Sequence, residues 1–198
     1  MSFVLQLEIT NNNTHDVSIE NVGFAHTDVE YVFSIPLQVD WKRGIREARS
    51  DLRSRQSVSG LNNAALHFEN SNNITLMNCS IEHVGGFGLW FGAGVRNARF
   101  AHGRVEDVGA GAVRIGDLSK AHPDPDPARV SRNVTVSDSI LHDGGNIYKA
   151  GCGVLLQAAA DCTITHNEIS MFRYTGISAG WDWACELQHK CQMFSDFH

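Results

Sequence analysis

Two aspartates occupy equivalent places in neighbouring repeats of this chain. Asp107 and Asp143 each stand ten residues after an asparagine that opens a repeat, at Asn97 and Asn133. If the repeats stack as parallel strands, which lie about 4.8 Å apart, the two carboxyl groups come within roughly 5 Å of each other. That separation suits the acid/base and the nucleophile of a retaining glycosidase, whereas inverting enzymes need more room for a water molecule. We therefore regard the two aspartates as a candidate catalytic pair.

Two histidines lie close to this pair in the pattern. His83 occupies the same place one repeat before Asp107, and His142 directly precedes Asp143. Either histidine could hydrogen-bond a sugar or tune the carboxyl groups. The competing interpretation is structural, because both aspartates come just before glycine-containing corners, where Asp is ordinary. The spacing alone leaves both interpretations open.

The repeat consists of five stretches that open with Asn or Asp and then alternate apolar with polar residues. The openers are Asp16, Asn73, Asn97, Asn133 and Asp161. Because Asn and Asp tolerate left-handed backbone and bond the chain two residues on, we expect the openers at a turn between sheets, with stacked amides hydrogen-bonded from coil to coil. Ten residues after each opener stand His26, His83, Asp107, Asp143 and Met171. Four of the five repeats then continue with a glycine-led apolar element, at Gly88, Gly111, Gly153 and Gly176. Such self-similarity is typical of a solenoid, in which equivalent residues stack above one another.

The spacing favours strands over helices as the repeating element. The glycine-led elements are separated by 111−88 = 23 and 176−153 = 23 residues, which is too short for a βαβ unit of about 30. Short alternating runs punctuated by Gly and Asn predict short strands with tight turns. We therefore expect an all-β fold, a parallel β-helix (solenoid) of about five coils, right-handed by the usual chirality of parallel crossovers. Its inward columns are expected to hold the buried free thiol of Cys162 and the apolar residues Ile74, Leu76, Ile81, Val105, Val134, Leu141, Ile164 and Ile169.

We expect one domain over residues 1–183, with inserted loops at 28–62 and 117–130 and an irregular tail or cap at 184–198. Alternating prolines from Pro123 to Pro127 exclude a strand or helix in the second loop. Long insertions in a solenoid cluster on one face and often build its binding site. Because the tail lacks both repeat elements, while a solenoid needs a cap at each end, we expect the chain to be a truncated piece of a longer β-helix.

Composition narrows the partners and cofactors. A formal net charge of −6 gives no basic face for nucleic acid, and no apolar run reaches the roughly 18 residues of a transmembrane helix. The first residues lack the pattern of a signal peptide. Cys185, His189 and Cys191 offer too few ligands for a metal site. We therefore expect a monomer without a metal or cofactor that contacts neither nucleic acid nor membrane.

Aromatic residues gather in the last repeats and could form a sugar-stacking platform. Trp181 and Trp183 alternate, so their side chains point the same way, and Tyr148 and Tyr174 lie nearby in the sequence. Exposed, such rings stack on sugars; buried, they belong to the core. We expect a substrate-binding role for His83, His142, Tyr148, Tyr174, Trp181 and Trp183.

A series of motifs extends this picture: Ala64–Phe68, Cys79–Gly86, Val105–Gly111, Ile140–Gly145, His166–Ile169 and Tyr174–Trp183. The series resembles the right-handed parallel β-helix proteins of the pectate-lyase-like superfamily. It is most similar to glycoside hydrolase family 141, of xylanase and α-L-fucosidase type, and its uncharacterised relatives. The resemblance covers roughly residues 14–183, and the Tyr174–Trp183 segment is its most specific part.

The resemblance implies a glycoside hydrolase that acts on a plant or microbial polysaccharide or oligosaccharide and uses two aspartates. Asp107 and Asp143 take that role because they stand in the matching Asp-x-Gly-x-Gly and His-Asp-Gly-Gly segments. Members of the group are long and secreted, which implies an extracellular or periplasmic place for the full-length family. We expect this chain to depart from the group by having neither a leader nor the coils that would follow Trp183.

Two other functions compete with hydrolysis. A polysaccharide lyase would need a Ca²⁺ cluster and a Lys or Arg base, for which the loop offers Lys120 and Arg129 with the acidic residues Asp117, Asp124 and Asp126. A non-catalytic carbohydrate-binding or structural solenoid, or an inactive fragment, would bind sugar through the aromatic residues without turnover.

Overall fold

The computed structural model describes residues 7–9, 14–26, 58, 61, 63–117 and 127–180 of the chain. Within these ranges the regular elements are short strands, and no helix is long and apolar enough to cross a membrane. The strands are β1 (Leu7–Ile9), β2 (Thr14–Glu20), β3 (Gly23–Ala25), β4 (Ala64–Phe68), β5 (Ser71–Met77), β6 (Ser80–Val84), β7 (Phe87–Phe91), β8 (Arg96–Ala101), β9 (Arg104–Val108), β10 (Val113–Ile115), β11 (Ser131–Ser137), β12 (Ile140–Gly144), β13 (Val154–Leu156), β14 (Ala159–Ala160), β15 (Thr163–Thr165), β16 (Glu168–Phe172) and β17 (Ile177–Ala179).

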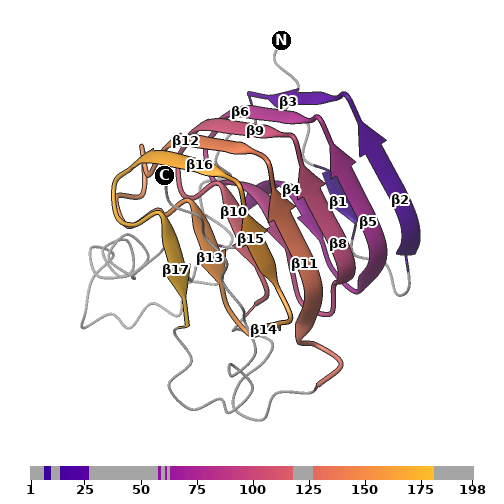
Figure 1. Cartoon of the computed structure of the whole chain (residues 1–198). Coiled ribbons are helices and arrows are strands. Elements are labelled where there is room, and N and C mark those ends of the chain that lie inside the picture. Colours follow the sequence, from indigo (N-terminus) through magenta and orange to yellow (C-terminus); the bar gives the residue numbers. More distant parts are fainter. Residues whose placement is uncertain are drawn as a thin grey trace, which may run out of the picture.

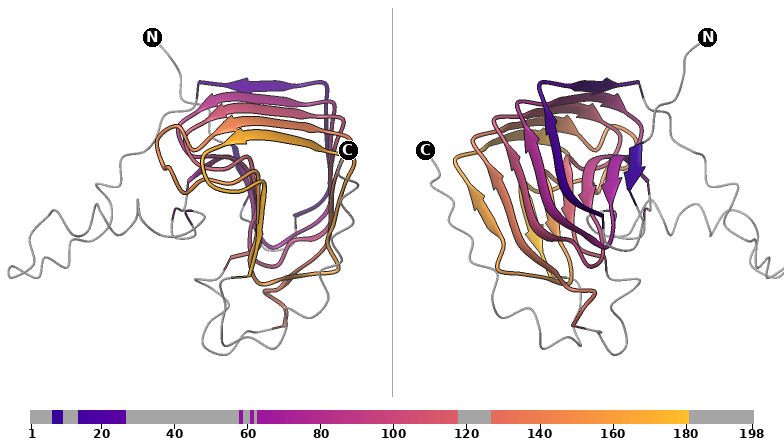
Figure 2. Two further views of the ribbon diagram at one scale, coloured as in Figure 1. Left: turned by 60° about the vertical axis from the view of Figure 1, so that its left-hand side comes forward. Right: turned by 90° about the vertical axis from the view of Figure 1, so that its right-hand side faces the viewer.

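The strands form three parallel sheets that wind around a common core (Figure 1). Sheet A has the order β1-β4-β7-β10-β13-β17, and sheet C has the order β3-β6-β9-β12-β16. Sheet B runs β2-β5-β8-β11, and both β14 and β15 pair with β11. Each coil therefore adds one step to each sheet, in the order A, B, C, and the views in Figure 2 show these coils stacked along one axis. The described strands make five such coils, with β17 continuing sheet A, so the predicted parallel β-helix is confirmed.

The core lies inside the coils and is built from columns of apolar side chains in register. Ile81 pairs with Val105, which pairs with Leu141, and all three side chains are fully buried. Burial of such large aliphatic side chains stabilises the fold by about 1.5–3 kcal/mol each. The predicted inward residues are buried as expected, except that Ile169 of the last sheet C strand is only partly buried. Cys162 is a buried cysteine outside any disulfide, as predicted, and its thiol donates to the Ala160 carbonyl oxygen at 3.4 Å.

Left-handed backbone recurs in three columns of the helix, five residues in each, with φ between 49° and 61°. Most residues that carry a Cβ avoid this conformation, because Cβ crowds the following carbonyl oxygen, but Asn, Asp and His are enriched in it. The first column kinks the strands of sheet B, the second turns the chain from sheet B to sheet C, and the third kinks the strands of sheet C. Their members are Asp16, Asn73, Asn97, Asn133 and Asp161; Asn21, Asn78, His102, Asp138 and His166; and His26, His83, Asp107, Asp143 and Met171.

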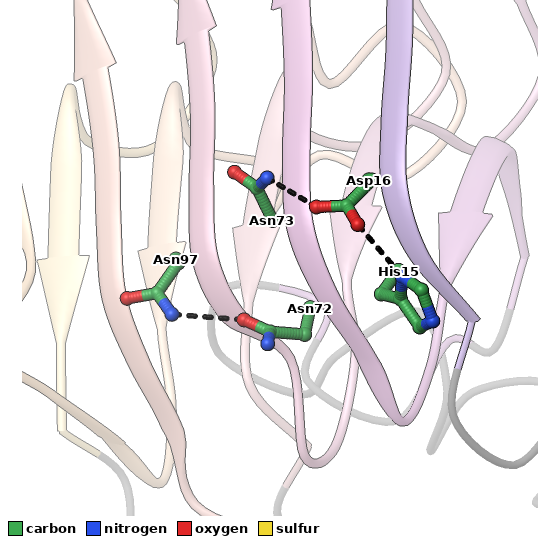
Figure 3. Close-up of polar contacts among 5 residues, drawn as sticks. All are labelled: His15, Asp16, Asn72, Asn73 and Asn97. Atoms are coloured by element: carbon green, nitrogen blue, oxygen red, sulfur yellow. Dashed lines mark hydrogen bonds and ion pairs between the residues drawn. The ribbon is translucent and has the colours of Figure 1, made fainter.

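Four of the five repeat openers therefore lie at kinks inside strands of sheet B, and Asp161 lies between β14 and β15, whereas the sequence suggested a turn between sheets. That turn is made five residues later by the second column, which the sequence analysis did not identify. Asn side chains at the kink donate hydrogen bonds to side chains of the coil before, as expected. The Asn73 amide donates to Asp16 Oδ1 at 2.5 Å, and the Asn97 amide donates to Asn72 Oδ1 at 2.8 Å (Figure 3). Asn133 continues the ladder by donating to Asn97 Oδ1 at 2.7 Å.

Insertions leave the coils at corners between sheets. The loop at 117–130 departs after β10, but residues 118–126, most of the loop at 28–62 and the tail at 184–198 lie outside the described residues. A further insertion follows β12. Val113 pairs with Val154, 41 residues on, while Val105 pairs with Leu141, 36 residues on, so this corner is 41−36 = 5 residues longer than the one before it. It protrudes beside the neighbouring corners in the end-on view (orange, Figure 2).

Candidate active site

The register of sheet C places the two aspartates in one column on adjacent strands. Glu106 pairs with His142 and Val108 pairs with Gly144, so Asp107 and Asp143 lie between matched pairs on β9 and β12. Adjacent parallel strands lie about 4.8 Å apart. In the same way, Glu82 pairs with Glu106, which places His83 of β6 directly before Asp107. The column thus runs through His83, Asp107 and Asp143 on three consecutive coils.

The backbone accounts for part of this pattern. Asp107 and Asp143 have φ of 49° and 52°, in the left-handed region that Asp tolerates better than most residues. The structural interpretation was therefore correct that these positions favour Asp, although they lie within the strands of sheet C and not in a corner. The kink also turns both side chains away from the core, which leaves them accessible to solvent; neither is buried.

Asp107 is held by two donors, one on each carboxylate oxygen. His83 Nδ1 donates to Asp107 Oδ2 at 2.6 Å, and Asn146 Nδ2 donates to Asp107 Oδ1 at 3.0 Å. The bond to Asp107, strengthened by the charges of Asp107, Glu82 and Glu106, raises the pKa of His83 above its usual value. His83 also stacks on His26 of the first coil, with 5.0 Å between the ring centroids. The Asp107 carboxylate is thus fixed in orientation by a hydrogen bond to each of its oxygens.

Asn146 reaches Asp107 because the longer corner between β12 and β13 is fastened to the coil before it. The backbone N–H groups of Gly145, Ile147 and Tyr148 donate to carbonyls of residues 109 and 110 at 2.7–3.0 Å. The Tyr148 side chain is 9% exposed and packs in a hydrophobic cluster outside sheet A. The expectation that Tyr148 offers a sugar-stacking surface is therefore corrected, since the residue anchors the corner.

Asp143 differs from Asp107 in its surroundings. Across the described part of the chain, no hydrogen bond or ion pair reaches the Asp143 side chain. Its neighbour His142 shares a hydrogen bond with Ser170 Oγ at 2.9 Å, between Nδ1 and the hydroxyl. One coil earlier, Arg104 donates to Glu106 at 2.5 Å, and this bond lowers the pKa of Glu106. The outer face of sheet C is therefore polar and charged, with one fixed and one unattached carboxylate side by side.

The remaining predicted binding residues are dispersed. Tyr174 follows β16 and is exposed, one coil beyond the corner that holds Asn146. Trp181 and Trp183 lie outside the described residues. His83 and His142 both lie on the outer face of sheet C beside the aspartate column, as expected from their spacing. The structure thus brings together the two aspartates and the two histidines, and it adds Asn146, which no sequence signal pointed to.

A second polar group, which the sequence analysis missed, lies on the outer face of sheet A. His67, Trp90 and Arg114 stand in register on β4, β7 and β10, with His67 and Trp90 stacked at 4.0 Å and the Arg114 guanidinium 4.1 Å from the Trp90 ring. Arg114 is buried, donates to the Leu61 carbonyl and faces Asp117 at 3.5 Å. Burial lowers the pKa of Arg114 to about 10.

This arrangement bears on the lyase alternative. Asp117, one of the acidic residues considered for Ca²⁺, is buried against Arg114, and Lys120, Asp124 and Asp126 lie outside the described residues. Among the residues that the structure does describe, no group of three or more His, Cys, Asp or Glu side chains is placed to hold a metal ion.

Comparison with known proteins identifies a matching family. The model of a family described as the right-handed β-helix region matches residues 44–185, which is 185−44+1 = 142 of the 198 residues. No curated protein and no solved structure matches the chain.

Proposed function

We propose that this chain, which belongs to the right-handed β-helix family, is a carbohydrate-active protein and acts as a glycoside hydrolase through Asp107 and Asp143. The observation that carries the proposal is the adjacency of the two carboxylates in one column of sheet C. The roughly 5 Å between neighbouring strands is close to the carboxyl separation of retaining enzymes. The resemblance to the glycoside hydrolase 141 group, with its plant and microbial polysaccharides and its secreted location, supports the same choice.

The composition of the three left-handed columns adds a second argument. In the sheet B kink and the corner column, ten positions hold five Asn, three Asp and two His. The sheet C column has the same backbone demand but no Asn, and its first four coils carry His26, His83, Asp107 and Asp143. Backbone conformation explains a choice among Asn, Asp and His. It does not explain why only ionisable groups fill these four coils, whereas acid–base chemistry does.

The different contacts of the two carboxylates support a different proposed role for each. Asp107 accepts hydrogen bonds from His83 and Asn146, which fix the direction of its carboxylate. It is the nucleophile that attacks the anomeric carbon. Asp143 accepts no such bonds within the described structure, so its carboxyl group is free to turn toward the substrate, and we assign it the role of the acid that protonates the leaving oxygen. Asp143 then acts as the base that activates water to hydrolyse the glycosyl–Asp107 intermediate.

The test is hydrolysis of aryl glycosides and plant polysaccharides by the native chain and by Asp107→Asn and Asp143→Asn. Both substitutions preserve shape and tolerate the left-handed backbone, so we expect unchanged circular dichroism with turnover reduced by at least about a hundredfold. Asp138→Asn is the matched control, because Asp138 has the same φ, 52°, in the corner column outside the proposed site. Full activity of Asp107→Asn would refute the assigned chemistry.

A specific observation favours one other function. Both oxygens of Asp107 are already engaged by protein donors, and the left-handed backbone by itself favours Asp at both positions. A non-catalytic carbohydrate-binding solenoid would show the same features. In that case the native chain binds oligosaccharides without turnover, and the two aspartate variants likewise form no product.

A further inference from the structure

Met171 is the exception in the sheet C column. Ser170 pairs with His142 and Phe172 pairs with Gly144, so Met171 lies on the strand next to Asp143, in the same column. Its φ is 61°, and its side chain is 64% exposed. Every other member of the three left-handed columns is Asn, Asp or His.

Two features of Met171 are unfavourable for stability. A long side chain without a local hydrogen-bonding group is disfavoured in the left-handed region, where Asn is tolerated. An apolar side chain exposed to this degree also gains nothing from burial. An unfavourable conformation that persists beside a candidate site is a recognised pointer to a functional role.

Two other exposed apolar side chains of this region lie in the corners that follow β12 and β16. Tyr174 lies three residues after Met171, and the N–H of the intervening Arg173 donates to the Gly144 carbonyl. Ile147 lies next to Asn146 on the corner that holds Asp107, and it is 47% exposed. Within the described residues, these three and Val22 are the exposed large hydrophobics. Three of the four therefore lie on the last two coils, in β16 or in the corners that follow β12 and β16.

We propose that Met171, flanked by Tyr174 and Ile147, is the apolar platform on which one sugar ring of the substrate lies beside Asp143. The ligand class is a pyranose ring that presents a face of C–H groups, because such a face packs on a thioether and on a phenol ring. The same ring would place its glycosidic oxygen toward Asp143 and its polar edge toward the charged face of sheet C. This inference rests on the proposed carbohydrate site, and it names the substrate face that the site recognises.

The experiment compares Met171→Asn, Met171→Leu and the control His166→Asn, all made in the Asp143→Asn chain so that no substrate is consumed. His166 has φ of 52° in the corner column, away from the platform. The probes are xylo-, cello- and pectin-derived oligosaccharides, titrated calorimetrically. We expect Met171→Asn to raise Tm by about 2–4 °C through relief of backbone strain and to weaken binding by roughly tenfold. Met171→Leu is expected to retain most of the affinity, and His166→Asn all of it.

The outcomes separate this inference from the proposed hydrolysis. Equal affinity of Met171→Asn and its parent would overturn the platform while leaving catalysis by the two aspartates intact. Weakened binding in a chain whose native form shows no turnover would support the platform and refute the hydrolase. Absence of oligosaccharide binding to the Asp143→Asn chain would overturn the inference. A change from oligomer to monomer on Met171→Asn, measured by light scattering, would assign Met171 to a contact between chains and overturn it as well.

Discussion

Replacing Asn97 tests whether left-handed backbone dictates the residue types of the columns. Asn97 lies at φ 54° in β8, donates to Asn72 Oδ1 at 2.8 Å and accepts from Asn133 at 2.7 Å. Asn97→Ala removes both hydrogen bonds of the side-chain amide. It also leaves in the left-handed region a residue that has a Cβ but no polar side-chain group. Asn97→Gly removes the same two bonds but has no Cβ. The pair therefore separates the cost of the backbone from the cost of the hydrogen bonds.

The magnitudes follow from the two contributions. The left-handed conformation costs a residue with a Cβ about 1–2 kcal/mol. Each exposed hydrogen bond of the side-chain amide contributes about 0.5 kcal/mol, the low end of the usual range for a hydrogen bond. Asn97→Ala should therefore lower the free energy of unfolding by about 2–3 kcal/mol. Glycine loses the same bonds and pays roughly 0.5–1 kcal/mol of chain entropy instead of the strain. We expect Asn97→Gly to be more stable than Asn97→Ala by about 1 kcal/mol.

The assay is urea unfolding followed by far-ultraviolet circular dichroism, with equal m-values required for all variants. Arg99→Ala is the matched control, because Arg99 is an exposed residue of the same strand with ordinary backbone, and its free energy of unfolding should change by less than about 0.5 kcal/mol. If Asn97→Ala were as stable as Asn97→Gly, left-handed backbone would not explain the column residues. The prevalence of Asn, Asp and His would then need a different cause at all three columns.

Two further predictions concern close packing and pH. Gly109→Ala would place a Cβ 2.1 Å from the Gly85 carbonyl oxygen, a backbone atom that cannot easily move, so we expect the free energy of unfolding in urea to fall by about 3 kcal/mol. Gly23→Ala is the control, because its Cβ meets only the rotatable Ser80 hydroxyl at 3.0 Å, and its free energy of unfolding should fall far less. Equal losses in the two variants would contradict the geometry. Because the bond to Asp107 raises the pKa of His83, its contribution to stability is fully present below the unfolded pKa near 6.5 and is lost as pH rises through the folded pKa. Thermal melts at pH 6 and pH 8 should therefore show a larger difference for the native chain than for Asp107→Asn, and parallel curves would exclude the linkage.

The repeating part of the fold could be predicted because stacking gives every column one backbone conformation. Constant conformation selects the same few side chains in each coil, as at Asn73, Asn97 and Asn133, so the columns are visible as a pattern in the sequence. The apolar columns follow equally directly, because an inward position of a strand stays inward on every coil. The alignment of Asp107 with Asp143, and of both with His83, follows from the same constancy.

The remaining features depend on contacts that no periodicity encodes. The extra residues of the corner after β12 could have been noticed, since Gly111 and Gly153 are separated by 153−111 = 42 residues while the corresponding openers differ by 36. Where Asn146 points, however, depends on how that corner folds back onto the coil before it. Tyr148 shows the same limit, because the sequence of a corner does not reveal whether an aromatic ring in it turns toward solvent or toward the core. The stack of Trp90 and Arg114 depends likewise on what covers sheet A.

The left-handed columns also have a consequence for how such a protein could acquire activity. The codons for Asn, Asp and His differ only in their first base, so a single nucleotide change exchanges an amide for a carboxylate or an imidazole. At ordinary surface positions, two such changes would fall at unrelated distances from each other. In these columns the backbone tolerates all three residues, and it holds the residues of adjacent coils one strand spacing apart. Drift at two adjacent coils is thus enough to place a pair of ionisable groups at a spacing suited to catalysis. A ladder maintained for folding can in this way supply variation on which selection for chemistry acts.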